Sequence, residues 1–213
     1  MKKPSTFLCL VSLLILQLGT AHAQNSPDKK CFFSPDALKL SIYNNQTYMP
    51  FVGFSNVWQS KMHPGIAVSF EKNLKQKTHL GYYYSLNAGV FNHRFVQTGV
   101  QLYSNIGVRF NLPKSFKLDA ELGAGYLHSL LHQKTFSMQD DGSYKQNKGL
   151  GRAQAMFAIA FAVSKEFSIK EKPCTAFVKY QPWFQLPYIN NYVPLLPNNA
   201  LHLGIGFPLT CNK

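Results

Sequence analysis

Acidic residues are scarce in this sequence of 213 residues, in which 9 Asp and Glu stand against 22 Lys and Arg, a formal net charge of +13. Charged residues make up only 15% of the chain, while 46% of the residues are hydrophobic and 14% are aromatic. This composition excludes an intrinsically disordered chain. Long apolar runs are also missing beyond the N-terminus, where none reaches the about 18 residues of a transmembrane helix. We therefore expect an ordered, basic protein without transmembrane helices.

Linkers rich in Ser and Gly, low-complexity tracts and long charge runs are absent too, so no domain boundary is visible. The four cysteines contain no C-x-x-C pair, which argues against a metal site built on them. The basic residues are spread along the chain and accompany no nucleic-acid-binding motif. We expect one domain with no cofactor, no bound metal and no nucleic-acid partner.

The N-terminus has the pattern of a secretory signal peptide. Lys2 and Lys3 precede an apolar run over 7–18, and Ala21-His22-Ala23 offers small residues for cleavage before Gln24. Residues 1–23 are thus predicted to be removed, which excludes a cytosolic enzyme. The mature chain, 24–213, keeps 20 basic and 9 acidic residues, a net charge of +11.

Apolar residues recur at every second position along most of the mature chain, which is typical of strands and fits no helix. The segments with this alternation are 66–71, 79–90, 100–112, 118–126, 157–164, 176–186 and 201–209. A further strand is expected at 37–44, and 51–58 is the alternative. Because bacterial single-chain outer-membrane barrels have even strand numbers, we count one of the two and predict eight strands.

The two faces of these strands differ in a way that distinguishes a membrane barrel from a soluble one. One face carries Leu, Ile, Val, Phe and Tyr without a charge, and the other is mostly Gly, Ala, Ser and Asn. Lipid outside and a narrow, closed lumen inside explain both faces. The sequence predicts an all-β fold, an eight-stranded antiparallel up-and-down transmembrane β-barrel.

The connections alternate in length, which orients the barrel. Short basic turns are expected at 72–77, 113–117 and 165–173. The opposite connections, 45–63, 129–152 and 188–199, are longer, and only 92–98 is brief on that side. We place the short turns, the N-terminal segment 24–36 and Lys39 at the periplasmic end. Cys31, Cys174 and Cys211 fall at the same end, an oxidising compartment. A Cys174–Cys211 disulfide between neighbouring strands is predicted, with Cys31 free or as the competing partner.

Taken together, the signal peptide, the alternating strands and the basic turns resemble the small outer-membrane β-barrel proteins of Gram-negative bacteria. Three short motifs are similar to uncharacterised barrels of Bacteroidetes-type bacteria: Met62-His63-Pro64-Gly65, Gly125-Tyr126-Leu127-His128 and Leu201-His202-Leu203-Gly204. The resemblance implies a fold and the cell outer membrane, and it implies no chemistry. Many such barrels end on an aromatic residue, whereas this chain ends Cys211-Asn212-Lys213.

Five charged residues have inward parity: Glu71, Arg109, Asp119, Glu121 and Lys179. Arg109 and Glu121 share a face across one hairpin and are expected to pair. Asp119 and Glu121 could in principle act as acid and base. We favour a luminal ion-pair network, because buried charges require partners.

Most histidines are expected at the outer rim, where a metal or haem site is one interpretation and solvated side chains are the other. The set is His63, His93, His128, His132 and His202. No His-x-x-His or Cys/His spacing supports a metal site, so we favour solvated or hydrogen-bonded histidines.

A second hypothesis is a lipid hydrolase. Tyr103-Ser104-Asn105 resembles the His-x-Ser-Asn element of outer-membrane lipid A deacylases, but Leu102 stands where the base should be. His128 and Ser129 could replace that base only with favourable geometry, and a serine without a base is a weak nucleophile. This lipid A-modifying activity stays the alternative.

The preferred function is that of a non-enzymatic outer-membrane barrel, structural or surface-binding through its extracellular loops. Its expected partners are outer-membrane lipids or lipopolysaccharide and an extracellular protein or glycan, and no residue set identifies the ligand. Aromatic residues such as Tyr83 and Trp183 are interpreted as interface girdles. The apolar loop over 188–199 either packs over the barrel mouth or binds a partner.

Overall fold

The computed structural model describes residues 35–50, 61–94, 96–132, 135–139, 141–147, 151–170, 172–188 and 194–209. The predicted signal peptide 1–23 and most of segment 24–36 lie outside these ranges. The strands of the described chain are β1 (Ala37–Gln46), β2 (Pro64–Gln76), β3 (Leu80–His93), β4 (Gln97–Asn111), β5 (Phe116–Leu131), β6 (Thr135–Met138), β7 (Tyr144–Asn147), β8 (Arg152–Ile169), β9 (Lys172–Leu186) and β10 (Leu196–Pro208). A 3-10 turn, η1 (Pro113–Ser115), joins β4 to β5. No helix in these ranges is both long and apolar enough to cross a membrane.

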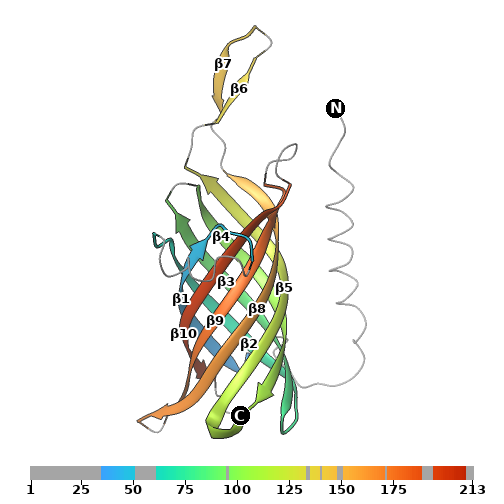
Figure 1. Ribbon diagram of the computed structural model, residues 1–213, viewed down its shortest axis with the longest axis vertical. Coiled ribbons are helices and arrows are strands. Elements are labelled where there is room, and N and C mark those ends of the chain that lie inside the picture. Colours follow the sequence, from blue (N-terminus) through green and yellow to red (C-terminus); the bar gives the residue numbers. More distant parts are fainter. Residues whose placement is uncertain are drawn as a thin grey trace, which may run out of the picture. The chain divides into compact units, whose positions relative to one another are not determined.

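Eight of the strands form a closed antiparallel barrel in the order β1-β10-β9-β8-β5-β4-β3-β2 (Figure 1). The barrel closes where β1 pairs with both β2 and β10, with Ala37 opposite Pro208 and Glu71. Strands β6 and β7 form a separate two-stranded sheet within the connection from β5 to β8. The predicted eight-stranded barrel is confirmed, and β1 is the strand expected at 37–44. The alternative strand at 51–58 lies outside the described residues.

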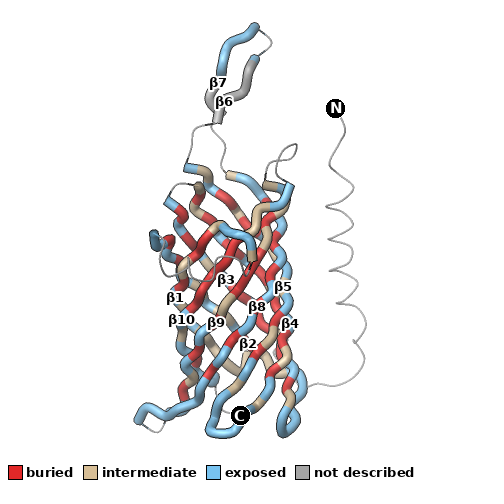
Figure 2. The backbone as a smooth tube through the Cα atoms, in the orientation of Figure 1, coloured by how far each residue is buried: buried red, intermediate tan, exposed pale blue. Residues whose placement is uncertain are grey.

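Burial alternates along the barrel strands as the period-two pattern requires (Figure 2). In β5, Asp119 and Glu121 are buried in the lumen, while Leu118 and Leu122 are exposed on the outer face. At one end the strands run almost into each other, so that β8 ends at Ile169 and β9 begins at Lys172. At the other end three of the four connections are longer, and the one from β5 to β8 carries β6 and β7. Only β3 and β4 are joined there by a short turn, 94–96. The predicted alternation of short and long connections is therefore present.

The lumen holds large aromatic side chains, which the sequence interpretation placed elsewhere. Tyr83 and Trp183 are fully buried, so neither is part of an outer girdle. Glycines on adjacent strands make room for several of these rings: a Cβ added to Gly107 would lie 2.3 Å from Cζ of Tyr83. Glycine therefore occurs at some inward-facing positions because the aromatic rings of neighbouring strands fill the space that a side chain there would need.

Candidate functional site

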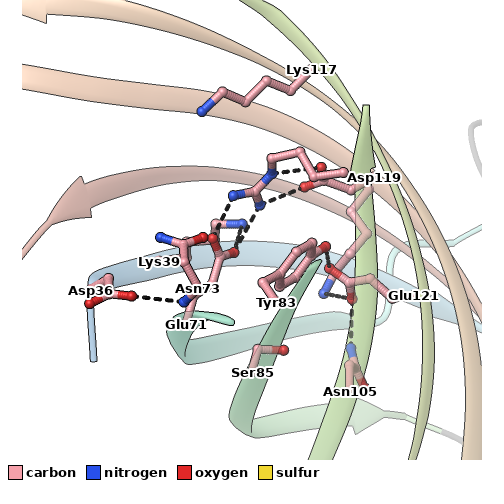
Figure 3. A network of polar contacts seen from close by, with 12 residues as sticks. Asp36, Lys39, Glu71, Asn73, Tyr83, Ser85, Asn105, Lys117, Asp119 and Glu121 are labelled. Carbon is pink, nitrogen blue, oxygen red and sulfur yellow. Dashed lines mark hydrogen bonds and ion pairs between the residues drawn. The ribbon is translucent and has the colours of Figure 1, made fainter. Parts of the chain in front are cut away.

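Arg109 is at the centre of a buried ion-pair network in the lumen. Figure 3 labels the three carboxylates of this network, Glu71, Asp119 and Glu121. Its Nη1 and Nη2 donate to the two carboxylate oxygens of Glu71, at 2.6 and 3.0 Å. Its Nε and Nη2 donate to Oδ1 and Oδ2 of Asp119, at 2.8 and 2.9 Å. The planar guanidinium therefore binds both carboxylates in bidentate fashion and links strands β2, β4 and β5.

The ladder register selects these partners. Arg109 lies directly opposite Asp119, whereas Glu121 lies opposite Gly107. The expected Arg109–Glu121 pair is therefore replaced by Arg109–Asp119. Glu121 instead accepts hydrogen bonds from Tyr83 Oη at 2.7 Å and Asn105 Nδ2 at 2.6 Å, and its Oε2 lies 3.6 Å from Nζ of Lys179.

Lys39 lies near the periplasmic end of β1, as expected, but it also belongs to this luminal network, which the sequence interpretation did not include. Its Nζ forms an ion pair with Glu71 and lies 5.6 Å from the ring centroids of Tyr83 and Phe177. The signal was present in the sequence, because Leu38 and Leu40 alternate with Lys39 and assign it to the inner face.

The network balances three cations, Lys39, Arg109 and Lys179, with the three carboxylates of Glu71, Asp119 and Glu121. The void beside it has a volume of about 20 Å³, far below that of small-molecule sites. Asp119 and Glu121 each already have a cationic partner and no room for a substrate beside them. This geometry is that of a structural network, not an acid–base pair.

The histidines predicted at the rim do not gather into one cluster. The His63 and His93 rings stack with centroids 3.6 Å apart and planes 6° apart, and both are buried. His202 lies in the lumen, stacked on Tyr43 with centroids 4.4 Å apart. Within the described residues no group of three or more His, Cys, Asp or Glu side chains is arranged to hold a metal ion.

Burial lowers the pKa of His63 below its ordinary value, because a charged imidazole is poorly solvated there. Neither of its ring nitrogens has a hydrogen-bond partner among the described residues, and the facing ring belongs to another basic residue. The stacked pair is therefore suited to two neutral imidazoles.

The serine and histidine candidates for lipid hydrolysis do not form a nucleophile–base pair. Ser104 is on the outer face opposite Leu86 and Ala124, with no histidine at either cross-strand position. His128 lies opposite Val100, four residues along β4 from Ser104, which is about 13 Å at the rise of a strand. Ser129 points into the lumen and donates to Oε1 of Gln97, away from His128. His128 itself bonds through Nδ1 to Tyr126 Oη at 2.8 Å.

One hydroxyl–imidazole contact was missed from the sequence: Thr98 Oγ1 and His132 Nε2 lie 2.8 Å apart on the outer face. The two residues are 34 positions apart and are brought together by the pairing of β4 with β5, in which Thr98 lies opposite Leu130, two residues before His132. No local spacing in the sequence indicates this contact.

Cys174 is buried and has no disulfide partner among the described residues. Cys31 and Cys211 lie outside the described residues, so the pairing of Cys174 with Cys211 stays a prediction.

Comparison with known proteins finds structural likeness only. No protein-family model matches the chain, and no curated protein matches its sequence. Among solved structures, it is similar to Neisserial surface protein A (8% identity, TM-score 0.49, covering 81% of this chain and 96% of that one). It is also similar to the outer membrane enzyme PagL (10%, 0.45, 81% and 99%) and to Ail, the attachment invasion locus protein of Yersinia pestis (12%, 0.42, 83% and 100%). At these identities the likeness concerns the barrel architecture and carries no argument about activity.

Proposed function

We propose that this chain is an integral barrel of the outer membrane of a Gram-negative bacterium and acts by binding a partner through its outer loops. The observation that carries the location is the apolar outer face of the barrel. Ile42, Ile106 and Leu122 expose 64%, 65% and 66% of their surface on three different strands. A continuous apolar belt of this kind is unfavourable in water and is satisfied by lipid.

Charge at the ends of the strands supports the same location. Lys165 lies on the outer face beside a short connection, with its Nζ 5.2 Å from the Phe116 ring centroid. Lys75, Lys114 and Lys170 belong to the short-connection end of the strands as well. A lysine at this depth can extend its amine to lipid headgroups while its methylenes stay on the apolar surface. The described chain enters and leaves the barrel at that end, at Ala37 and Pro208. We assign the end with the short connections to the periplasm.

Binding is assigned to the opposite end because the interior is filled. Phe91, Leu127, Met156 and Trp183 are at most 1% exposed within the barrel, which leaves no passage for transport. The long connection between β5 and β8 carries the β6–β7 hairpin, and Tyr144 there is 72% exposed. Function on loops held by a rigid scaffold is a common arrangement. The expected partners are an extracellular protein, a glycan or lipopolysaccharide.

Deletion of residues 133–148 tests this assignment. Cells that carry the full-length protein are compared with cells that carry the deletion for binding to immobilised lipopolysaccharide, a glycan array and extracellular matrix proteins. We expect the deletion to abolish binding and to leave the barrel in the membrane, with Tyr144→Ser as a milder loop variant. Binding that survives the deletion unchanged contradicts a role for this loop.

The alternative hydrolase based on Ser104 or on His128 and Ser129 has a separate test. Mass spectrometry of lipid A from cells with wild-type protein, Ser104→Ala or His128→Ala should give identical acyl patterns. An acyl chain lost with the wild type and restored by either variant would overturn our preference.

A further inference from the structure

The outer face carries a hydroxyl, an imidazole and an orienting carbonyl in hydrogen-bonded sequence. Thr98, near the start of β4, places Oγ1 2.8 Å from Nε2 of His132, which directly follows β5. Nδ1 of His132 lies 3.1 Å from the backbone carbonyl oxygen of Arg94. Both side chains are accessible from outside the barrel, unlike the luminal network.

The hydrogen-bond partners determine which nitrogen of His132 carries the proton. A carbonyl oxygen can only accept, so Nδ1 must donate to Arg94. Nε2 of the neutral ring is then unprotonated and accepts the Thr98 hydroxyl proton. This is the tautomer that a general base needs, and its orientation is held by a third group.

A polar donor lies beside the same oxygen. Asn92, directly opposite Thr98 in the ladder, donates from Nδ2 to Thr98 Oγ1 at 3.2 Å. The Asn92 amide therefore helps to orient the Thr98 hydroxyl oxygen.

The hydroxyl also opens onto an apolar groove. The groove has a volume of about 570 Å³, within the range of small-molecule sites, and Asn92 and Thr98 line part of its wall. Apolar side chains that include Ile42, Ile66, Val90 and Leu203 line much of the rest. His132 does not line this groove and approaches it only through its contact with Thr98. A larger apolar depression of about 830 Å³ is lined by neither residue. Apolar walls next to a polar reacting pair suit a long acyl chain with an ester at its polar end.

We propose that Thr98 and His132 form the reacting pair of an acyl-ester hydrolase whose substrate is a fatty-acyl ester of a membrane lipid. His132 Nε2 takes the proton of Thr98, and Thr98 Oγ1 attacks the ester carbonyl carbon. Collapse of the tetrahedral intermediate breaks the ester C–O bond, and the leaving alcohol takes the proton from His132. Water, activated in the same way, releases the fatty acid from Thr98 and restores the hydroxyl. This activity rests on the membrane location proposed above and is independent of partner binding by the loop.

The test uses the full-length protein reconstituted in two kinds of vesicles, one of phosphatidylethanolamine with phosphatidylglycerol and one that also contains lipopolysaccharide. Released fatty acid is measured by mass spectrometry, so that the two lipid sources are distinguished. The variants are Thr98→Val, which removes the hydroxyl at nearly constant shape, His132→Gln, and Thr98→Ser, which keeps a hydroxyl. Ser104→Ala and His128→Gln are matched controls on the same face.

We expect release from at least one vesicle type, lowered by about 100-fold or more in Thr98→Val and His132→Gln. The two controls should keep the activity, and Thr98→Ser should release more fatty acid than Thr98→Val because it still carries a hydroxyl. Intact-protein mass should show a transient acyl adduct in every variant that releases fatty acid and none in Thr98→Val. Heat-modifiable migration on gels checks that each variant is folded. Absence of fatty acid from both vesicle types, or release unchanged in Thr98→Val, overturns the proposal. Thr98→Val should retain partner binding, so failure of the catalytic proposal is separate from failure of the loop assignment.

Discussion

At the scale of single residues, Arg109 is the side chain on which the interior depends most. It bridges Glu71 and Asp119 with four hydrogen bonds, and all three groups are almost fully buried. Burying a single cation destabilises the folded state. Removing Arg109 from this network would destabilise it further, because two buried carboxylates would remain unpaired.

Arg109→Leu should therefore lower the free energy of unfolding by about 3–5 kcal/mol, the usual effect of breaking a buried pair. Urea unfolding of the vesicle-inserted barrel, followed by tryptophan fluorescence, measures this change. Lys75→Leu, at an exposed position of β2, serves as the control and should change stability little. Equal stability of Arg109→Leu and the wild type would mean that the network contributes nothing.

His63 makes the outer end sensitive to acid. Its folded-state pKa is lowered by burial, whereas an unfolded histidine titrates near 6.5. As pH falls below about 6.5, His63 is protonated when the structure around it is locally unfolded but stays neutral when that structure is folded. The locally folded state therefore loses stability relative to the unfolded one. Above that range both states are neutral and the effect vanishes.

We expect amide hydrogen exchange around Asn45 and His63 to be faster at pH 5.5 than at pH 7.5 after correction for intrinsic rates. Asn45 N–H donates to the His63 carbonyl at 2.9 Å, so this amide reports on the contact directly. His63→Gln should flatten the pH dependence. Exchange that follows pH equally in both proteins contradicts the role of His63.

At the scale of the strands, sequence alternation was sufficient for the barrel because burial on one face and lipid on the other impose period two. Alternation did not predict which side chains of the inner face form ion pairs with one another. Asp119 and Glu121 have the same parity, so only the register of β4 against β5 assigns Arg109 to Asp119. Trp183 shares parity with Lys179 and could have been placed in the lumen, but aromatic residues fit either face. The Thr98–His132 contact depends on the same register of β4 against β5, because Thr98 lies opposite Leu130 and His132 follows two residues later.

The outer face of β5 gives a prediction about membrane insertion. Leu122 lies near the middle of the strand and is 66% exposed. Leu122→Arg should lower the stability of the inserted barrel by about 2–4 kcal/mol, the cost of a cation near the bilayer midplane. The matched variant Phe116→Arg, at the first position of the strand, should cost about 0–1 kcal/mol. Unfolding in vesicles measures both, and equal costs would mean that the outer face does not cross a bilayer.

For the whole molecule, a filled barrel should not conduct ions. Trp183 and Tyr83 occupy the lumen together with the balanced charge network, and eight strands leave room for side chains rather than for a water column. Purified protein in planar bilayers should show no stable single-channel steps. A reproducible conductance would contradict the closed lumen.

Fractionation of native cells tests whether these eight strands span a membrane. Membranes are washed with urea, and the protein is then run on gels with and without boiling. We expect the protein to stay in the urea-washed membranes and to migrate faster unboiled than boiled, because the closed barrel resists detergent until heated. Recovery in the soluble periplasmic fraction, with a single heat-independent band, would contradict it.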